Sequence, residues 1–228
     1  MKKFERLIPL LGRYALDTLN KKSVIVFGLG GVGGYVVEAL CRSGITNLTL
    51  VDNDTIAESN INRQILATTS TIGLQKTEVA KNRILDINPS CKVTCYNTFF
   101  LPNDDTIKNW DEFDYIVDAI DTVTAKIELC QIAKDKNIPI ISCLGTGNKL
   151  HPELLEVSTI EKTSVCPLAR VMRRELAKRD ITNVKVVYST EKPITNAENL
   201  NYTASFIAVP ATAGLLIATT VITDLIKL

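Results

Sequence analysis

The residues with the clearest chemical signature are a cluster of glycines and an acid that follows it. Gly28, Gly30 and Gly33 fit the pattern G-x-G-x-x-G directly after the β-branched run 23–27. Glycines at these positions allow a sharp turn and a close backbone approach to phosphate, and the N–H groups that open the next helix attract the anion. Asp52 ends the following strand, where its carboxylate can accept a hydrogen bond from a ribose hydroxyl. This arrangement predicts a nucleotide site.

Polar residues further along the chain indicate which kind of nucleotide chemistry to expect. Asn60, Arg63 and Gln64 lie in a long polar loop, Lys76 begins the next predicted helix, and Asp121 follows a later strand. A dehydrogenase needs no arginine and lysine after its ribose acid. An enzyme that handles a triphosphate does, because cations and Mg²⁺ stabilise the charge that builds on the leaving pyrophosphate. We therefore expect triphosphate chemistry, with Asp121 holding the Mg²⁺ through water.

Short apolar strands that alternate with helices must position these groups. The alternation predicts an α/β fold with a doubly wound, mostly parallel, Rossmann-like sheet. Ligands of such sheets bind at the carboxyl ends of the strands, where the residues named above would gather. Strands are predicted at 23–27, 47–51, 91–97, 115–121 and 138–143, and helices at 32–43, 76–87, 104–110 and 124–136.

The pattern changes after Gly147. Segments 154–160 and 185–190 resemble strands, with a helix at 167–179 between them, and we interpret them as an extension of the same sheet. No internal repeat or low-complexity linker divides the chain. We therefore predict a single domain, made of an amphipathic N-terminal segment (1–20), a nucleotide-binding core (21–150) and a C-terminal α/β extension (151–228).

The segment 208–222 is almost wholly apolar. It is shorter than the roughly 20 residues that a membrane span requires. We interpret it as a terminal apolar helix in the core or at a dimer interface. Peripheral membrane association through this helix is the alternative.

The composition is that of an ordinary cytoplasmic enzyme. The 228 residues carry a net charge of +1, so a nucleic-acid contact would need a local basic patch. The N-terminus has no apolar stretch of the kind found in secretory signals. The six cysteines form no C-x-x-C pair, which favours reduced thiols. We interpret Cys143 and Cys166, the two tempting nucleophiles, as small buried hydrophobes.

One local basic patch lies on the predicted helix 167–179. Between residues 161 and 193 there are eight basic residues against four acidic ones. Two interpretations stay open, an exposed charged face and a contact with nucleic-acid phosphates. The residues expected in such a contact are Arg170, Arg173, Arg174 and Lys178.

Five motifs, in this order, resemble the adenylating domain of the ubiquitin-activating-enzyme-like (ThiF-type) superfamily. The resemblance implies an ATP site with Mg²⁺, with Arg63, Lys76 and Asp121 in catalysis and Asp121 on the metal. Of Asp118 and Asp121, we expect one to contact the nucleotide or Mg²⁺ and the other to cap the helix that follows, with Asp121 favoured for the metal. The motifs are Gly28-Leu-Gly30-Gly31-Val-Gly33, Asp52-Asn-Asp54, Asn60-Ile-Asn-Arg63-Gln64, Gly73-Leu-Gln-Lys76 and Asp118-Ala-Ile-Asp121.

The opening of the chain, Arg6-Leu-Ile-Pro-Leu-Leu-Gly12, is similar to the N-terminal arginine segment of that superfamily. In the family this arginine reaches into the nucleotide site of the partner subunit. The resemblance therefore implies a homodimer in which Arg6 acts in trans.

The rest of the chain resembles one branch of the superfamily, which dehydrates threonylcarbamoyladenosine beside the anticodon of bacterial tRNA. The resemblance implies that ATP adenylates the free carboxylate of the modification and that its own ureido group then closes the ring, with release of AMP. An intramolecular nucleophile removes the need for a catalytic cysteine. The chain is short for this branch, and the connection 190–205 looks compressed. The motifs include Leu144-Gly-Thr-Gly-Asn-Lys149 and Lys162-Thr-Ser-Val-Cys-Pro167.

Two other functions remain open. One is adenylation of the C-terminal glycine of a ubiquitin-like sulfur-carrier protein, which would then be a partner. Family members of that branch commonly hold zinc with two C-x-x-C pairs, and both pairs are absent here, so no structural zinc is expected. The other is a non-catalytic nucleotide-binding scaffold. The complete set of Arg6, Arg63, Lys76 and Asp121 speaks against a scaffold.

Overall fold

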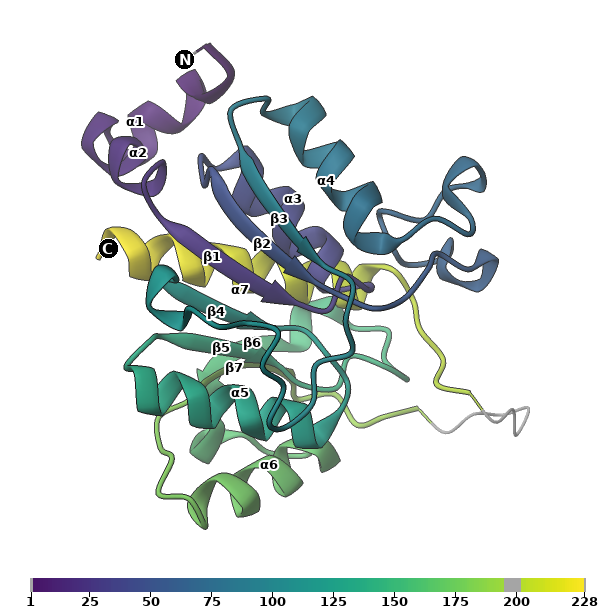
Figure 1. The fold of residues 1–228 in the computed structure, drawn as a ribbon. Helices are drawn as coiled ribbons and strands as arrows, with labels where there is room; N and C mark the ends of the chain where they lie inside the picture. Colours follow the sequence, from purple (N-terminus) through teal and green to yellow (C-terminus); the bar gives the residue numbers. More distant parts are fainter. Residues whose placement is uncertain (1, 195–201, 228) are drawn as a thin grey trace.

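A seven-stranded sheet organises the chain, as the computed structural model of residues 2–194 and 202–227 shows (Figure 1). The strand order is β3-β2-β1-β4-β5-β7-β6, and all neighbours are parallel except β6 and β7. This confirms the predicted doubly wound sheet and its C-terminal extension. The strands are β1 (Ser23–Phe27), β2 (Asn47–Val51), β3 (Lys92–Tyr96), β4 (Tyr115–Asp118), β5 (Ile140–Cys143), β6 (Leu155–Thr159) and β7 (Lys185–Ser189).

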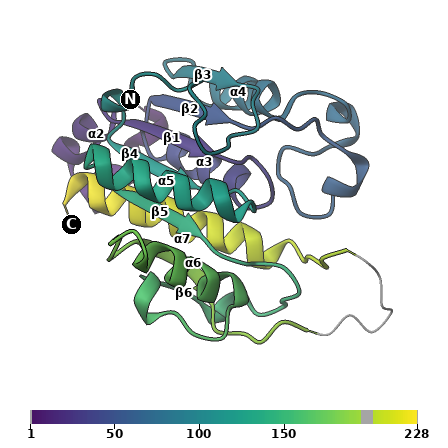
Figure 2. The ribbon, with the colours of Figure 1, turned by 60° about the horizontal axis from the view of Figure 1, so that its bottom comes forward.

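Helices cover both faces of this sheet. In Figure 2, α5 and α7 lie on opposite sides of the strands. The helices are α1 (Ile8–Leu11), α2 (Arg13–Leu19), α3 (Gly33–Arg42), α4 (Lys76–Ile87), α5 (Val123–Lys136), α6 (Pro167–Ala177) and α7 (Ala208–Ile226). Short 3₁₀ turns are η1 (Lys2–Leu7), η2 (Glu58–Asn60), η3 (Thr69–Thr71), η4 (Trp110–Glu112), η5 (Pro152–Leu154) and η6 (Ile160–Lys162).

The alternation of side chains along β1 divides the core between the two faces. Val24 and Val26 pack with apolar residues of α3 and α7, whereas Ile25 and Phe27 pack with residues of α5. All four are fully buried, which explains why this strand reads as a continuous apolar run. A further cluster beneath α6 fills the space between that helix and the extension of the sheet.

The parallel register brings the carboxyl ends of the central strands level with one another. Phe27 is paired with both Val51 and Asp118, and Val51 is paired with Tyr96. Residues that follow β1, β2, β3 and β4 therefore emerge at one edge of the sheet. This edge carries the glycine turn and the predicted acids.

The prediction of a helix at 104–110 is wrong. Residues 104–109 are irregular, and only the turn η4 follows them. The Asp104 carboxylate accepts a hydrogen bond from the Thr106 N–H, and Asn103 has a positive φ of 65°. Local bonds of this kind compete with a helix. Trp110 instead packs in an aromatic group with Phe27 and Phe100.

The terminal helix α7 is longer than predicted, ending at Ile226 rather than at residue 222. In the part of the chain that the structure describes, α7 is the one helix whose length and apolar composition would allow it to cross a membrane. Its Val209, Ala213, Ile217 and Val221 are fully buried in the main core. The helix thus packs as a core element, as the favoured interpretation of the sequence expected.

Replacing Gly214 by valine is expected to destabilise the protein by about 1–3 kcal/mol, because this contact has no room for a side chain. A Cβ at Gly214 would lie 2.5 Å from the Val32 carbonyl oxygen and 2.9 Å from the Tyr35 Cβ, both at the start of α3. Denaturant unfolding measures the change. Leu215→Ala on the exposed side of α7 is the control, and an equal loss in both variants would contradict close packing as the cause.

Candidate active site

The carboxyl edge of the sheet surrounds a cavity of about 620 Å³. Its walls come from the glycine turn, the loops after β2, β3, β4 and β5, and the start of α4 and α7. Most of the residues predicted from the sequence meet here although they are far apart in the chain. Those that line the cavity are Gly28, Gly30, Gly31, Asp52, Asp54, Asn60, Arg63, Gln64, Lys76 and Asp121.

Close approach of backbone segments explains two of the glycines in the turn. A Cβ at Gly33 would lie 1.8 Å from the carbonyl oxygen of Gly28, so no side chain fits there. Gly28 has a φ of +84° and packs against Ala119 after β4, whose carbonyl oxygen would be 2.6 Å from a Cβ. The turn is thus docked on the loop that leads to Asp121. Gly33 supports the cavity from behind and does not line it.

Asp52 fixes the glycine turn from the neighbouring strand. Its carboxylate accepts hydrogen bonds from the backbone N–H groups of Leu29, at 2.6 Å, and of Asp54, at 2.8 Å. Burial raises the pKa of Asp52, against the opposing effect of the nearby Lys76 ammonium. The carboxylate still faces the cavity, where a ribose hydroxyl can reach it.

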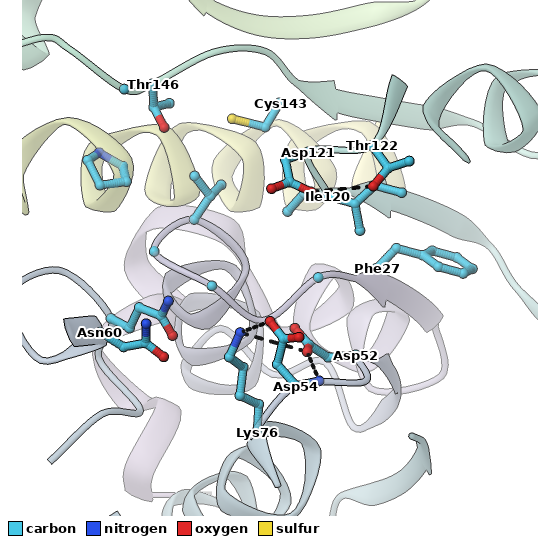
Figure 3. Close-up of a pocket in the computed structure, with 18 of the residues that line it drawn as sticks. Phe27, Asp52, Asp54, Asn60, Lys76, Ile120, Asp121, Thr122, Cys143 and Thr146 are labelled. Carbon is cyan, nitrogen blue, oxygen red and sulfur yellow. Dashed lines mark hydrogen bonds and ion pairs between the residues drawn. The ribbon is translucent and has the colours of Figure 1, made fainter. Parts of the chain in front are cut away.

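Lys76 places an ammonium group inside the cavity (Figure 3). Its Nζ lies 2.6 Å from the Asp54 carboxylate and 3.8 Å from that of Asp52. Only 6% of the Lys76 side chain is exposed, whereas Asp54 is 58% exposed. An incoming phosphate can therefore take the place of the solvated Asp54 as a partner of this cation.

The polar loop after β2 supplies one side of the cavity. The Asn60 side chain accepts the Ala57 N–H at 3.1 Å, and the Arg63 guanidinium donates to the Ser59 carbonyl oxygen at 2.8 Å. Gln64 is buried, and its amide oxygen has no hydrogen-bond partner within the described residues. The Gln64 residue lines the cavity, with this oxygen itself buried.

The two acids at the end of β4, Asp118 within the strand and Asp121 after it, have different environments. Asp121 is exposed on the side of the cavity opposite Lys76, where Thr122 donates a 3.5 Å hydrogen bond to it (Figure 3). Asp118 is fully buried and bonds to the Lys126 ammonium at 3.0 Å. It does not cap α5, so that prediction is wrong: Thr122 is the N-cap residue and makes no side-chain cap bond. The Asp118 carboxylate binds the Lys126 ammonium instead of the backbone N–H groups at the start of α5.

The cysteines give no sign of an activated thiol in the cavity. Cys143 lines it, but burial raises the pKa of Cys143 to about 12, so the thiol stays protonated at neutral pH. Cys166 is buried at the start of α6. Throughout 2–194 and 202–227, no three His, Cys, Asp or Glu side chains form a group that could hold a metal ion.

Arg6 and the predicted basic residues of helix α6 are not among the residues that line the cavity, although Leu168 of α6 is. The segment η1 that carries Arg6 is at the N-terminal end, beyond the amino ends of the strands (Figure 1). On α6, Arg173 donates to the Thr163 carbonyl oxygen at 2.8 Å and is partly buried, while Arg174 and Lys178 surround Glu175. Arg170 is exposed.

Sequence reasoning missed several groups in and beneath the cavity. Thr203 and Ser205 line it from a returning segment that Asn62 and Asn148 hold by hydrogen bonds to Ser205 and Ala204. Part of the connection predicted to be compressed, residues 195–201, lies outside the described residues. Lys126 and Ser142 were also missed. The sequence did contain one indication of a role for Lys126, because this lysine lies on the apolar face of a predicted helix.

Comparison with known proteins gives a consistent match along the chain. The ThiF family model matches residues 4–228. The chain is 36% identical to the tRNA threonylcarbamoyladenosine dehydratase of Bacillus subtilis (strain 168), over 98% of this chain and 94% of that protein. It is 38% identical to the Escherichia coli (strain K12) protein of the same name, over 77% of this chain and 65% of that one.

A solved structure matches the fold equally well. The crystal structure of E. coli tRNA N6-threonylcarbamoyladenosine dehydratase, TcdA, in complex with ATP superimposes with a TM-score of 0.92 and 31% identity. The match covers 99% of this chain and 94% of that chain, and the complex with AMP matches to the same degree. The motifs, the sheet and these matches agree. The chain belongs to the ThiF family.

Proposed function

We propose that the chain is an ATP-dependent adenylating enzyme that dehydrates N6-threonylcarbamoyladenosine in tRNA. The observation that carries this proposal is the convergence of ten predicted site residues on one cavity, in a fold that matches the ATP-bound TcdA structure over 99% of the chain. The substrate is taken from the names of the relatives that align over most of the chain.

The reaction has two steps. The free carboxylate of the threonyl group attacks the α-phosphorus of ATP, and pyrophosphate leaves. The ureido group of the modification then attacks the acyl-adenylate carbon, the ring closes, and AMP carries away one carboxylate oxygen. The net change in the nucleoside is the loss of one water.

The cavity residues fit this chemistry. The glycine turn and Asp52 hold the nucleotide, while Arg63 and Lys76 stabilise the charge on the leaving pyrophosphate. Neither Cys143 nor Cys166 is required, because the nucleophile of the second step belongs to the substrate.

Asp121 is the proposed protein ligand of Mg²⁺. The exposed Asp121 carboxylate at the cavity fits an ion that prefers one or two carboxylates together with waters and substrate phosphates. The Mg²⁺ would supply charge neutralisation on the phosphates. Asp118 is not available as a second ligand, because Lys126 and Ser142 occupy its carboxylate.

The working unit is proposed to be a cytoplasmic homodimer. Arg6 lies on η1 and does not line the cavity of its own chain, so the catalytic role proposed for Arg6 would be exercised at the cavity of a second copy. The N-terminal segment lies beyond the amino ends of the strands, whereas the cavity lies at their carboxyl ends (Figure 1).

The exposed basic residues of α6 are proposed to bind tRNA phosphates. The double substitution Arg170→Glu and Arg174→Glu is expected to weaken tRNA binding by at least about tenfold. The salt slope of binding should fall by about one for each phosphate that is no longer neutralised. Arg173 is left intact because it holds Thr163. Filter binding at several salt concentrations measures both effects.

The double substitution Lys21→Glu and Lys92→Glu, at exposed positions before β1 and on the edge strand β3, is the control matched in charge. It changes the net charge without touching α6. Equal weakening in the α6 variant and in the control would indicate a general charge effect and would remove α6 from the tRNA interface.

Incubation with ATP, Mg²⁺ and tRNA that bears the linear modification tests the proposed function. The modified nucleoside should lose the mass of one water, and AMP should form in equal amount. An unchanged nucleoside, with AMP release instead in the presence of a β-grasp carrier protein, would assign the site to carrier activation. No turnover with either acid would favour a nucleotide-binding scaffold.

A further inference from the structure

Three polar side chains are completely buried directly beneath the cavity. They are Asp118 at the end of β4, Lys126 in the second turn of α5 and Ser142 near the end of β5, each with 0% exposure. Asp118 and Ser142 are partners in the parallel register of β4 and β5. The group therefore joins two adjacent strands and the helix that connects them.

Lys126 is the centre of this group. Its Nζ donates to both Asp118 carboxylate oxygens at 3.0 Å, to the Cys143 carbonyl oxygen at 2.7 Å and to the Ser142 hydroxyl oxygen at 3.2 Å. The Ser142 hydroxyl in turn donates to Asp118, which also accepts the Ile120 N–H at 3.3 Å. Every charged group in the network is thus hydrogen-bonded.

Stability alone gives little reason for such a network. Removing two charges from water is costly, and well-packed apolar residues of similar volume often serve as well or better. Buried ion pairs are best explained where they impose one arrangement on the groups around them. Here they tie the last residues of β4 and β5 together at a fixed separation.

The residues held in this way lead straight into the cavity. Residues 119–122 follow Asp118 and residues 143–147 include and follow the anchored Cys143, and both segments line the cavity. The glycine turn also rests on Ala119 through Gly28. Movement at Asp118 would therefore displace Asp121 and the wall at Leu144 relative to the phosphate-binding turn, which Asp52 holds from the side of β2.

We propose that Lys126 is a positioning residue, which with Asp118 and Ser142 sets the distance between the metal-binding acid Asp121 and the phosphate-binding turn. The inference rests on the proposed adenylation function. It gives the first acid of the Asp118-Ala-Ile-Asp121 motif a role distinct from the second. Neither Lys126 nor Asp118 is among the residues that line the cavity.

The test replaces the ion pair by neutral residues of similar size, Asp118→Asn with Lys126→Met. The expected result is a kcat lower by on the order of 100-fold, because small misplacements of reacting groups have effects of this size. The dissociation constant for ATP should change by less than about threefold, because Asp52 and Lys76 are held independently of the network. The melting temperature should stay equal or rise.

Tyr115→Phe is the matched control. It removes a buried hydrogen bond to an acid at the other end of the same strand, where Tyr115 donates to Asp224 at 2.7 Å. Lys185 remains bonded to Asp224, so no charge is left unpaired. This control should keep the wild-type kcat. A double variant that folds and retains the wild-type kcat would overturn the proposal, as would parallel losses of kcat and ATP affinity.

Ser142→Ala provides a second variant in case the double substitution does not fold. It removes one hydroxyl and should lower kcat several-fold while the affinity for ATP is kept. An unchanged kcat would again overturn the proposal.

Hydrogen exchange gives a readout that needs no activity. Amides in 119–122 and 143–147 should exchange faster in the network variants than in the wild type and the Tyr115→Phe control, and equal rates would contradict positioning. Lack of dehydration by the wild type would instead refute the proposed function.

Discussion

Lys76→Ala is expected to lower turnover by 100- to 1,000-fold, by order of magnitude, as found when a donor to a developing charge is removed. The dissociation constant for ATP should rise by no more than about tenfold, since binding also depends on the glycine turn and Asp52. Lys76 lies in the cavity with its ammonium between Asp52 and Asp54. Arg63→Ala should give the same division between turnover and binding. Single-turnover release of pyrophosphate, beside calorimetric ATP binding, measures the two effects separately.

Lys81→Ala is the control, because Lys81 lies on the same helix α4 and is not among the residues that line the cavity. It should leave both turnover and ATP affinity unchanged. Equal losses of turnover and affinity in Lys76→Ala would mean that Lys76 serves only to bind the nucleotide. The assigned role on the leaving pyrophosphate would then be wrong.

Arg6→Ala and Asp121→Ala should each abolish turnover in pure form and restore part of it when the two variants are mixed. If Arg6 acts in trans, each mixed dimer contains one site with both residues intact. Random exchange of equal amounts of subunits predicts about one quarter of the wild-type activity, because half of the dimers are mixed and each has one working site. Turnover is measured after subunit exchange, and native mass spectrometry verifies that mixed dimers form.

Mixed dimers that form but remain inactive would contradict action in trans. The expected control is a mixture of Arg6→Ala with Lys76→Ala, which should also recover activity because Lys76 and Asp121 line the same cavity. A mixture of Asp121→Ala with Lys76→Ala should not recover, because both changes damage the site that each subunit builds from its own residues.

The periodicity of apolar residues and the residues typical of turns were sufficient to predict most of the fold. β1 and β2 have the predicted bounds because each is a short apolar run ended by a turn or an acid. The helix at 104–110 failed for a reason that the sequence contains only in part. Local bonds of Asp104 favour a turn, but the packing of Trp110 against Phe27 is a tertiary contact between distant segments.

The candidate site likewise contains residues that could be predicted from the sequence and residues that could not. Glycines, acids and cations in motifs could be predicted because their spacing reflects strand ends that meet at one edge. The partner of Asp118 could not, because a short motif does not reveal that the carboxylate is fully buried beside a lysine eight residues later. The wall formed by Thr203 and Ser205 depends on hydrogen bonds to Asn62 and Asn148 across the fold. Only the assembled structure brings these groups together.

The central claim is that the cavity adenylates a carboxylate, and the fate of that carboxylate's oxygen tests it most directly. The substrate is tRNA whose threonyl carboxylate carries oxygen-18, incubated with unlabelled ATP and Mg²⁺. Attack on the α-phosphorus followed by ring closure predicts that one labelled oxygen appears in AMP and the other stays in the cyclised nucleoside. Label in orthophosphate or pyrophosphate, or in none of the phosphate products, would contradict the account.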